Sequence, residues 1–174
     1  VLPKKEINSN TTFNFTTYWD LYKQVQPETH NNEAEVEKKL EELLYKSVET
    51  QMVSDVPLGS FLSGGIDSSL ITALAAKIKK DKIKTFSIGY KDTKFDESVY
   101  ARKVAEHIGT EHYAYTMTEN NLEEILLDII TVFDEPFCDS SAFPTMLISK
   151  KAKEHVTVAL SGDGGDELFM GYGM

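Results

Sequence analysis

Two glycine-rich segments of the chain carry more hydroxyl and carboxylate groups than an ordinary turn needs. The first is Ser63-Gly64-Gly65-Ile66-Asp67-Ser68-Ser69, which follows the apolar pair Phe61-Leu62 and opens a predicted helix. Its glycines let the backbone approach an oxyanion closely, and the unpaired N–H groups and dipole of a helix N-terminus favour negative charge there. The serine hydroxyls add further donors, so the segment predicts a phosphate cradle.

Asp67 is the one member of this segment that a phosphate would repel. A carboxylate among phosphate-binding donors is reasonable where Mg²⁺ lies between the two, because Mg²⁺ prefers oxygen ligands. The segment is not a Walker loop, since Gly65-Ile66 stands where Lys-Ser/Thr is required, and it does not match the dinucleotide fingerprint. The alternative is a strand-to-helix turn capped by Asp or Ser, which the full seven-residue pattern disfavours.

The second segment is Ser161-Gly162-Asp163-Gly164-Gly165-Asp166-Glu167, directly after the apolar run 156–160. Its oxygen ligands suit Mg²⁺. Alternatively, Asp166 and Glu167 only favour the positive end of a helix dipole, a role that does not exclude a metal. If the strands before the two segments lie side by side, both segments face one crevice, and Asp67 and Asp166 can hold one Mg²⁺ over a triphosphate.

The elements that must position these segments alternate along the chain from residue 33 onward. Hydrophobic periodicity predicts helices from 33 to before 55 and at 67–79, 96–108, 119–133 and about 143–153, and strands at 57–62, 83–88, 111–116 and 156–160. This alternation predicts an α/β fold, a doubly wound parallel sheet with helices on both faces. The last strand is nearly all apolar, which predicts that both its faces are covered. Ligands in such folds bind beyond the carboxyl ends of the strands, where the strand order reverses.

Composition excludes several classes of protein. The chain has 174 residues, 41% hydrophobic and 26% charged, which is typical of a soluble globular protein. Its net charge of −10 argues against nucleic-acid and anionic-membrane partners, and no apolar run approaches the length of a membrane span. The single cysteine, Cys138, excludes an internal disulfide framework and favours the reducing cytoplasm.

Several segments together resemble the synthetase domain of the glutamine-hydrolysing asparagine synthetases, a family of N-type ATP pyrophosphatases with the adenine nucleotide alpha hydrolase-like fold. They are Asp55-Val56-Pro57-Leu58-Gly59, Leu62 through Ser69, Phe86-Ser87-Ile88-Gly89 and Ser161 through Tyr172, in the family's order. Tyr18-Trp19-Asp20-Leu21 resembles that family's interdomain linker. The resemblance implies that 1–32 is a linker after a glutaminase domain, and that 33–174 is the N-terminal part of a synthetase domain truncated at its C-terminus.

The resemblance also implies the chemistry. A carboxylate, aspartate in the parent family, attacks the α-phosphate of ATP in the presence of Mg²⁺. The products are an acyl-adenylate and pyrophosphate, and ammonia from the glutaminase domain then displaces AMP. The family places a catalytic lysine further downstream, so the 174 residues alone are expected to be inactive.

Site residues follow from the resemblance position by position. The pyrophosphate portion is expected at Ser63, Gly64, Gly65, Asp67, Ser68 and Ser69, AMP at Leu62, Ser87, Ile88, Ser161 and Gly162, and Mg²⁺ at Asp67 and Asp166. Asp163 stands where asparagine synthetases often carry the longer Glu, near the acyl carbon and the incoming amine. Arg102 matches an arginine that offsets phosphate charge.

Two rival functions stay open at this point. One is a related adenylating amidotransferase or a β-lactam synthetase-like enzyme that acts on another carboxylate. The other is a nucleotide-binding domain without catalysis. A homo-oligomer also stays open, because nothing in the sequence decides the oligomeric state.

Overall fold

The structure is a computed structural model, which describes residues 16–24, 32–91, 96–135 and 139–172. Cys138 lies outside these residues. The chain divides into two compact units, Val1–Glu37 and Lys38–Met174. The described part of the first unit holds the short helix α1 (Leu21–Gln24), where the Asp20 carboxylate accepts a hydrogen bond from the Tyr22 N–H at 3.0 Å.

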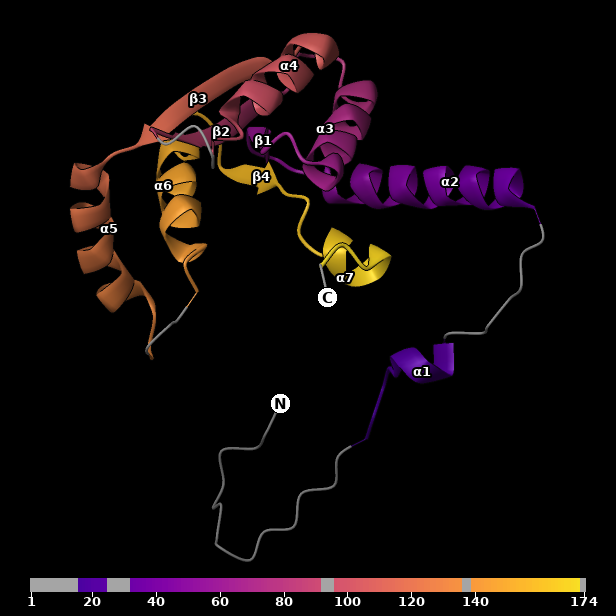
Figure 1. Cartoon of the computed structure of the whole chain (residues 1–174). Coiled ribbons are helices and arrows are strands. Elements are labelled where there is room, and N and C mark those ends of the chain that lie inside the picture. The colour runs from indigo at the N-terminus through magenta and orange to yellow at the C-terminus, as the bar shows by residue number, and fades with distance from the viewer. Residues whose placement is uncertain (1–15, 25–31, 92–95, 136–138, 173–174) are drawn as a thin grey trace, which may run out of the picture. The chain divides into compact units, whose positions relative to one another are not determined.

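The second unit is built around a sheet of parallel strands, β1 (Leu58–Phe61), β2 (Lys84–Tyr90), β3 (Glu111–Met117) and β4 (Val158–Leu160). Their order is β3-β2-β1-β4 (Figure 1). Gly59 of β1 lies opposite Lys84 of β2 on one side and Ala159 of β4 on the other. The chain therefore builds outward from β1 in one direction and returns to its other side with β4. The strand order reverses between β1 and β4, and this is where a parallel sheet opens a crevice for ligands.

Helices cover both faces of the sheet, as the sequence predicts. They are α2 (Glu33–Gln51), α3 (Ile66–Ile78), α4 (Ser98–Ile108), α5 (Glu119–Val132), α6 (Ala142–Ala152) and α7 (Gly165–Phe169). On one face, Leu62 is buried against Ala101 and Ala105 of α4. A buried hydrogen bond of 2.8 Å between the Ser60 and Thr72 hydroxyls joins the same side of β1 to α3.

The opposite face of the sheet is covered by α5 and α6. Phe86 packs against Ala152 and Val156, and Met117 packs against Ile125 of α5 and Leu147 of α6. Side chains of β2 thus alternate between the two helical layers, as a strand requires. This arrangement is the doubly wound α/β architecture, and it leaves the carboxyl ends of the strands free to carry loops.

The last strand differs from its prediction. The apolar run 156–160 was expected to be covered on both faces, yet β4 begins only at Val158, whose relative exposure is 37% against 6% for Val156. Within the described residues β4 pairs with β1 alone and forms an edge of the sheet. The expectation of a fully covered strand is therefore wrong for this part of the chain.

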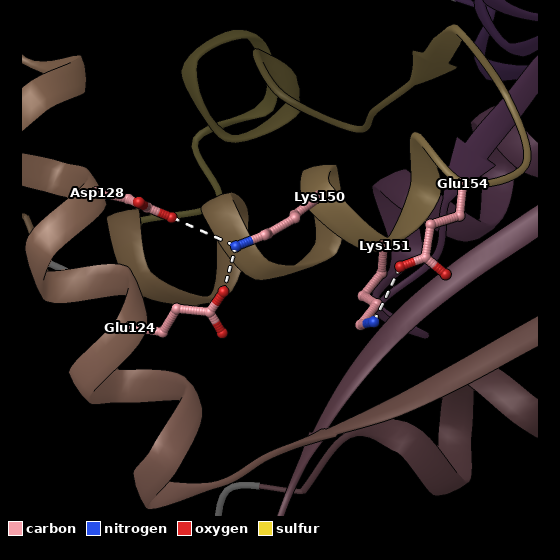
Figure 2. Close-up of polar contacts among 5 residues, drawn as sticks. All are labelled: Glu124, Asp128, Lys150, Lys151 and Glu154. Atoms are coloured by element: carbon pink, nitrogen blue, oxygen red, sulfur yellow. Dashed lines mark hydrogen bonds and ion pairs between the residues drawn. The ribbon is translucent and has the colours of Figure 1, made fainter.

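Two lysines of α6 form ion pairs with nearby carboxylates (Figure 2). Lys150 reaches across to α5, where its Nζ lies 2.5 Å from Glu124 Oε1 and 3.5 Å from Asp128 Oδ2. Lys151 pairs with Glu154 just beyond the end of α6 at 2.9 Å. These pairs are exposed to solvent, so each contributes little to stability, and only the Lys150 pairs join α6 to α5. None of the described helices combines the length and apolar character that a bilayer span requires.

Candidate functional site

The two glycine-rich segments meet beyond the carboxyl ends of β1 and β4, at the edge of a cleft of about 430 Å³. Each wall of the cleft comes from a different element. The described lining residues are Phe61, Leu62, Ser63, Gly65, Asp67, Ser68, Ser87, Ile88, Tyr90, Glu97, Pro144, Thr145, Ile148, Ser161, Gly162 and Asp163. The structure thus brings most of the predicted nucleotide-binding residues to one place.

The first segment turns sharply because α4 packs directly on it. Gly64 has a φ of +92°, a conformation that side chains other than glycine rarely adopt. A Cβ at Gly64 would also lie 2.5 Å from the Ala101 nitrogen and 2.7 Å from Tyr100 Cβ. Gly64 does not line the cleft itself, and its role here is to let the phosphate segment fold under α4.

Hydrogen bonds within the first segment gather its hydroxyls at one point. The Ser63 and Ser68 Oγ atoms are 2.9 Å apart, and the Gly65 N–H donates to Ser63 Oγ at 3.2 Å. α3 begins after Gly65 with no side chain capping it. No Asp or Ser side chain therefore caps α3, although the Ser63 and Ser68 hydroxyls hold the turn itself together. The start of α3 instead presents N–H groups and hydroxyls together, which is what an anion requires.

The second segment lies against the start of α3. A Cβ at Gly162 would come within 2.7 Å of the Ser68 nitrogen, and one at Gly165 within 2.5 Å of Asp67 Oδ1. The loops are therefore in contact, which confirms that the first and last strands bring both segments to one crevice. Within this loop the Ser161 hydroxyl donates to Asp163 Oδ2 at 2.9 Å, so the Asp163 carboxylate is held beside its own loop at the rim of the cleft.

The two predicted metal ligands share a second cleft, of about 420 Å³, on the other side of Asp67. Asp67 and Asp166 line it together with apolar side chains of α2, α3 and α7. No group of three or more histidine, cysteine, aspartate or glutamate residues suited to a metal occurs in the described chain. Asp67 borders both clefts and Asp166 lines the second, so Asp67 is the carboxylate next to the phosphate cradle. One or two carboxylates plus substrate phosphates commonly hold Mg²⁺, and this donor set fits that ion.

A histidine of the neighbouring strand β3 contacts the Ser87 hydroxyl. The Ser87 hydroxyl lies 3.3 Å from His112 Nε2, while Thr85 Oγ1 lies 3.0 Å from His112 Nδ1. Burial, and to a smaller extent the nearby Arg102 charge, lowers the pKa of His112 below its usual value of 6.5. A neutral imidazole therefore spans the two hydroxyls and fixes Ser87 at the floor of the cleft.

Three predicted residues lie outside this cleft besides Gly64. Arg102 is exposed on α4 and is not among the described lining residues, while its neighbour Ala101 takes the buried position against Leu62. Ser69 lies in the first turn of α3, and its Oγ is buried without a hydrogen-bond partner among the described atoms. Asp166 lines the second cleft only.

Several lining residues were missed from the sequence. The start of α6 contributes Pro144, Thr145 and Ile148, whose types carry no chemical signal. The end of β2 contributes Tyr90, and Glu97 stands just before α4. Glu97 has a sequence signal, because it lies in the same segment as Arg102, Asp96 through Arg102.

Comparisons with known proteins agree with this geometry. The sequence model of the family described as "Asparagine synthase" matches residues 39–174. A putative glutamine-hydrolyzing asparagine synthetase 2 of Methanocaldococcus jannaschii is 42% identical over 89% of this chain and 30% of that protein. The glutamine-hydrolyzing asparagine synthetase 1 of Bacillus subtilis is 42% identical over 91% of this chain and 24% of that protein. The chain thus spans about a quarter to a third of the length of these relatives.

Solved structures with a similar fold are more distant in sequence. The NH3-dependent NAD synthetase of Campylobacter jejuni matches with a TM-score of 0.52 at 17% identity, over 79% of this chain and 61% of that one. The glutamine-dependent NAD+ synthetase of Acinetobacter baumannii, solved with adenosine diphosphate, matches with a TM-score of 0.52 at 19% identity, over 78% of this chain and 27% of that one. These matches show that the fold is adenine nucleotide alpha hydrolase-like.

Proposed function

The chain belongs to the asparagine synthase family, and from this premise we propose that it is the nucleotide-cleaving part of a ligase that amidates a carboxylate. The reaction runs through an acyl-adenylate and releases AMP and pyrophosphate. The observation that supports this most directly is the contact of the two glycine-rich loops at the point where the strand order reverses. The ADP-bound Acinetobacter structure of the same fold supports an adenine nucleotide as the ligand.

The nucleotide is proposed to lie along the cleft with its phosphates at the start of α3. The hydroxyls of Ser63 and Ser68, the N–H groups of the first turn of α3 and the backbone of Gly65 hold the pyrophosphate portion. Mg²⁺, held by Asp67 and Asp166, would supply charge neutralisation at these phosphates. Removing one preorganised donor from such a site typically lowers the rate by ~10²–10³-fold.

The adenosine portion is proposed to lie over the ends of β1 and β2. Leu62 and Ile88 supply apolar walls, the Ser87 hydroxyl is fixed by His112, and Ser161 and Gly162 close the side toward β4. This arrangement orients the α-phosphate toward Asp163, at the rim where an attacking carboxylate and the incoming amine must enter. Arg102 would offset phosphate charge from outside the described lining of the cleft.

Aspartate is the proposed acceptor, and ammonia from a glutaminase domain is the proposed nitrogen source. The relatives are named glutamine-hydrolyzing asparagine synthetases, which supports both. The cytoplasm is the proposed location, without nucleic-acid or membrane partners, in keeping with a net charge of −10. Whether the working form is a homo-oligomer would be read from its mass in solution.

Pyrophosphate release by the protein expressed from its complete coding sequence tests this function. MgATP and ammonia are supplied with aspartate, with glutamate or with a β-amino carboxylate, and AMP is measured alongside. Release that depends on aspartate and yields asparagine supports the proposal. Release with another carboxylate only would assign a related adenylating enzyme, and binding of MgATP without release for any acceptor would assign a nucleotide-binding domain.

A further inference from the structure

Glu97 places an exposed carboxylate, without a partner among the described residues, in the lining of the nucleotide cleft. It lies immediately before α4 and lines the cleft next to Tyr90. Its backbone oxygen accepts hydrogen bonds from the Tyr100 and Ala101 N–H groups at 2.9 and 3.1 Å. Its side chain makes no ion pair or hydrogen bond with the described part of the chain, so the backbone is fixed while the carboxylate is left for a ligand.

The position of Glu97 is set from two sides. On one side the Asp96 carboxylate accepts a hydrogen bond from the Ser98 N–H at 3.0 Å and lies against Gly89 of β2. On the other side Ala101 and Tyr100 pack on Gly64 of the phosphate segment. One helical turn, about 5.4 Å of rise, separates Glu97 from Ala101. Glu97 therefore stands between the end of β2 and the phosphate segment, roughly one turn away from the latter.

The ribose is the part of a nucleotide that occupies this interval, because it lies between the α-phosphate and the base. A carboxylate accepts hydrogen bonds and donates none, and ribose supplies two neighbouring hydroxyl donors. An acidic residue serves this purpose in dinucleotide-binding folds. Tyr90 lines the same cleft, and burial, followed by the Glu97 charge, raises the pKa of its phenol.

We propose that Glu97 accepts hydrogen bonds from the ribose hydroxyls of the bound nucleotide and thereby selects ribonucleotides over deoxyribonucleotides. The inference rests on the proposed function for its choice of ligand. It adds a specificity-determining residue on α4 to the phosphate and metal residues of the two glycine-rich loops. The acceptor's ammonium group and the exocyclic amine of the base are the other groups that a carboxylate at this place could bind, and the experiment separates them.

The experiment measures kcat/KM for pyrophosphate release with ATP, 2′-deoxyATP and 3′-deoxyATP in the protein from the complete coding sequence. The unchanged protein is expected to prefer ATP by about 10- to 100-fold, the range of a hydrogen bond to a charged group. Glu97→Ala should lower kcat/KM for ATP to near the deoxyATP value while leaving the deoxyATP value within about threefold. Glu106→Gln, an exposed change further along α4, should leave all three values unchanged.

The outcomes that overturn the inference are distinct. An unchanged preference for ATP in Glu97→Ala removes the ribose role, and a higher KM for the acceptor with that preference intact assigns Glu97 to the acceptor instead. GTP is measured as a fourth nucleotide, and a change in the ratio of kcat/KM for ATP to that for GTP, with the ribose preference intact, assigns Glu97 to the base. If the protein releases no pyrophosphate with any acceptor, the proposed function fails. Calorimetric binding of ATP and 2′-deoxyATP to both variants then still tests Glu97.

Discussion

Replacing Gly165 by alanine tests whether Asp67 must hold its observed position. An ideal Cβ at this residue would lie 2.5 Å from Asp67 Oδ1, 2.6 Å from its Cγ and 3.0 Å from its Cβ. An ordinary contact needs at least 3.4 Å, so the carboxylate must move by about 0.9 Å. Gly165 begins α7 and its φ is not positive, so alanine itself fits the backbone there.

Gly165→Ala is expected to lower activity strongly and the free energy of unfolding only modestly. Asp67 has a movable side chain, so the loss of unfolding free energy should stay within the ~1–3 kcal/mol of a modest overpacking. A catalytic group displaced by 1 Å can cost ~10²-fold in rate. We therefore expect Gly165→Ala to lower Mg²⁺-dependent pyrophosphate release by about 10- to 100-fold, with a higher Mg²⁺ requirement.

Gly109→Ala provides the control for stability. Gly109 ends α4 with a φ of +81° and no neighbour within 4 Å of an added Cβ. Alanine there costs about 1–2 kcal/mol through backbone strain alone and should leave turnover unchanged below the melting range. In the Asp67→Ala background, which removes the contacting carboxylate, Gly165→Ala should cost less unfolding free energy than it does in the unchanged protein. Normal Mg²⁺ dependence and turnover in Gly165→Ala would refute the role given to Asp67.

Three further predictions follow from the same contacts. Asp67→Ala should fold, with thermal melts close to the unchanged protein, and abolish Mg²⁺-dependent pyrophosphate release; retained release would contradict the metal role. Gly64→Ala should destabilise the fold by about 2–5 kcal/mol in urea unfolding, since it adds left-handed strain to a clash with the Ala101 backbone; an unchanged midpoint would contradict that packing. Because the pKa of His112 is lowered in the folded state, its share of stability is complete above pH 6.5 and is lost as the pH falls below that value. Melting temperatures between pH 7.5 and 5.5 should therefore fall more steeply for the unchanged protein than for His112→Asn, and parallel curves would contradict this.

The secondary structure could be predicted because each element carries its own periodicity. The apolar spacing of 119–133 is a local property of the sequence, and the structure confirms a helix there as α5. The order of the strands could not be predicted from the sequence, because no local feature shows that β4 pairs with β1. The prediction of one shared crevice therefore depended on that pairing. Once that pairing exists, the meeting of the two loops follows from parallel strands alone.

The sequence does not reveal the position of a side chain where that position depends on a distant element. Arg102 stands in a motif, but the small residue Ala101 sets the rotation of α4 by packing under Leu62, and a motif does not reveal that rotation. Thr145 and Pro144 enter the cleft only because α6 crosses the end of the sheet. β4 is apolar like a central strand, yet its outer side has no partner within the described residues.

The glycines of the second loop have a packing role that the sequence does not reveal. From sequence, this segment is predicted only to be a metal and phosphate site. In the structure neither Gly162 nor Gly165 has a positive φ, and the space that each leaves is filled by the first turn of α3 and by the Asp67 carboxylate. Their small size therefore serves the contact between the two loops. A larger residue at Gly162 would push the second loop away from the Ser68 backbone, and one at Gly165 would displace the Asp67 carboxylate, before any nucleotide binds.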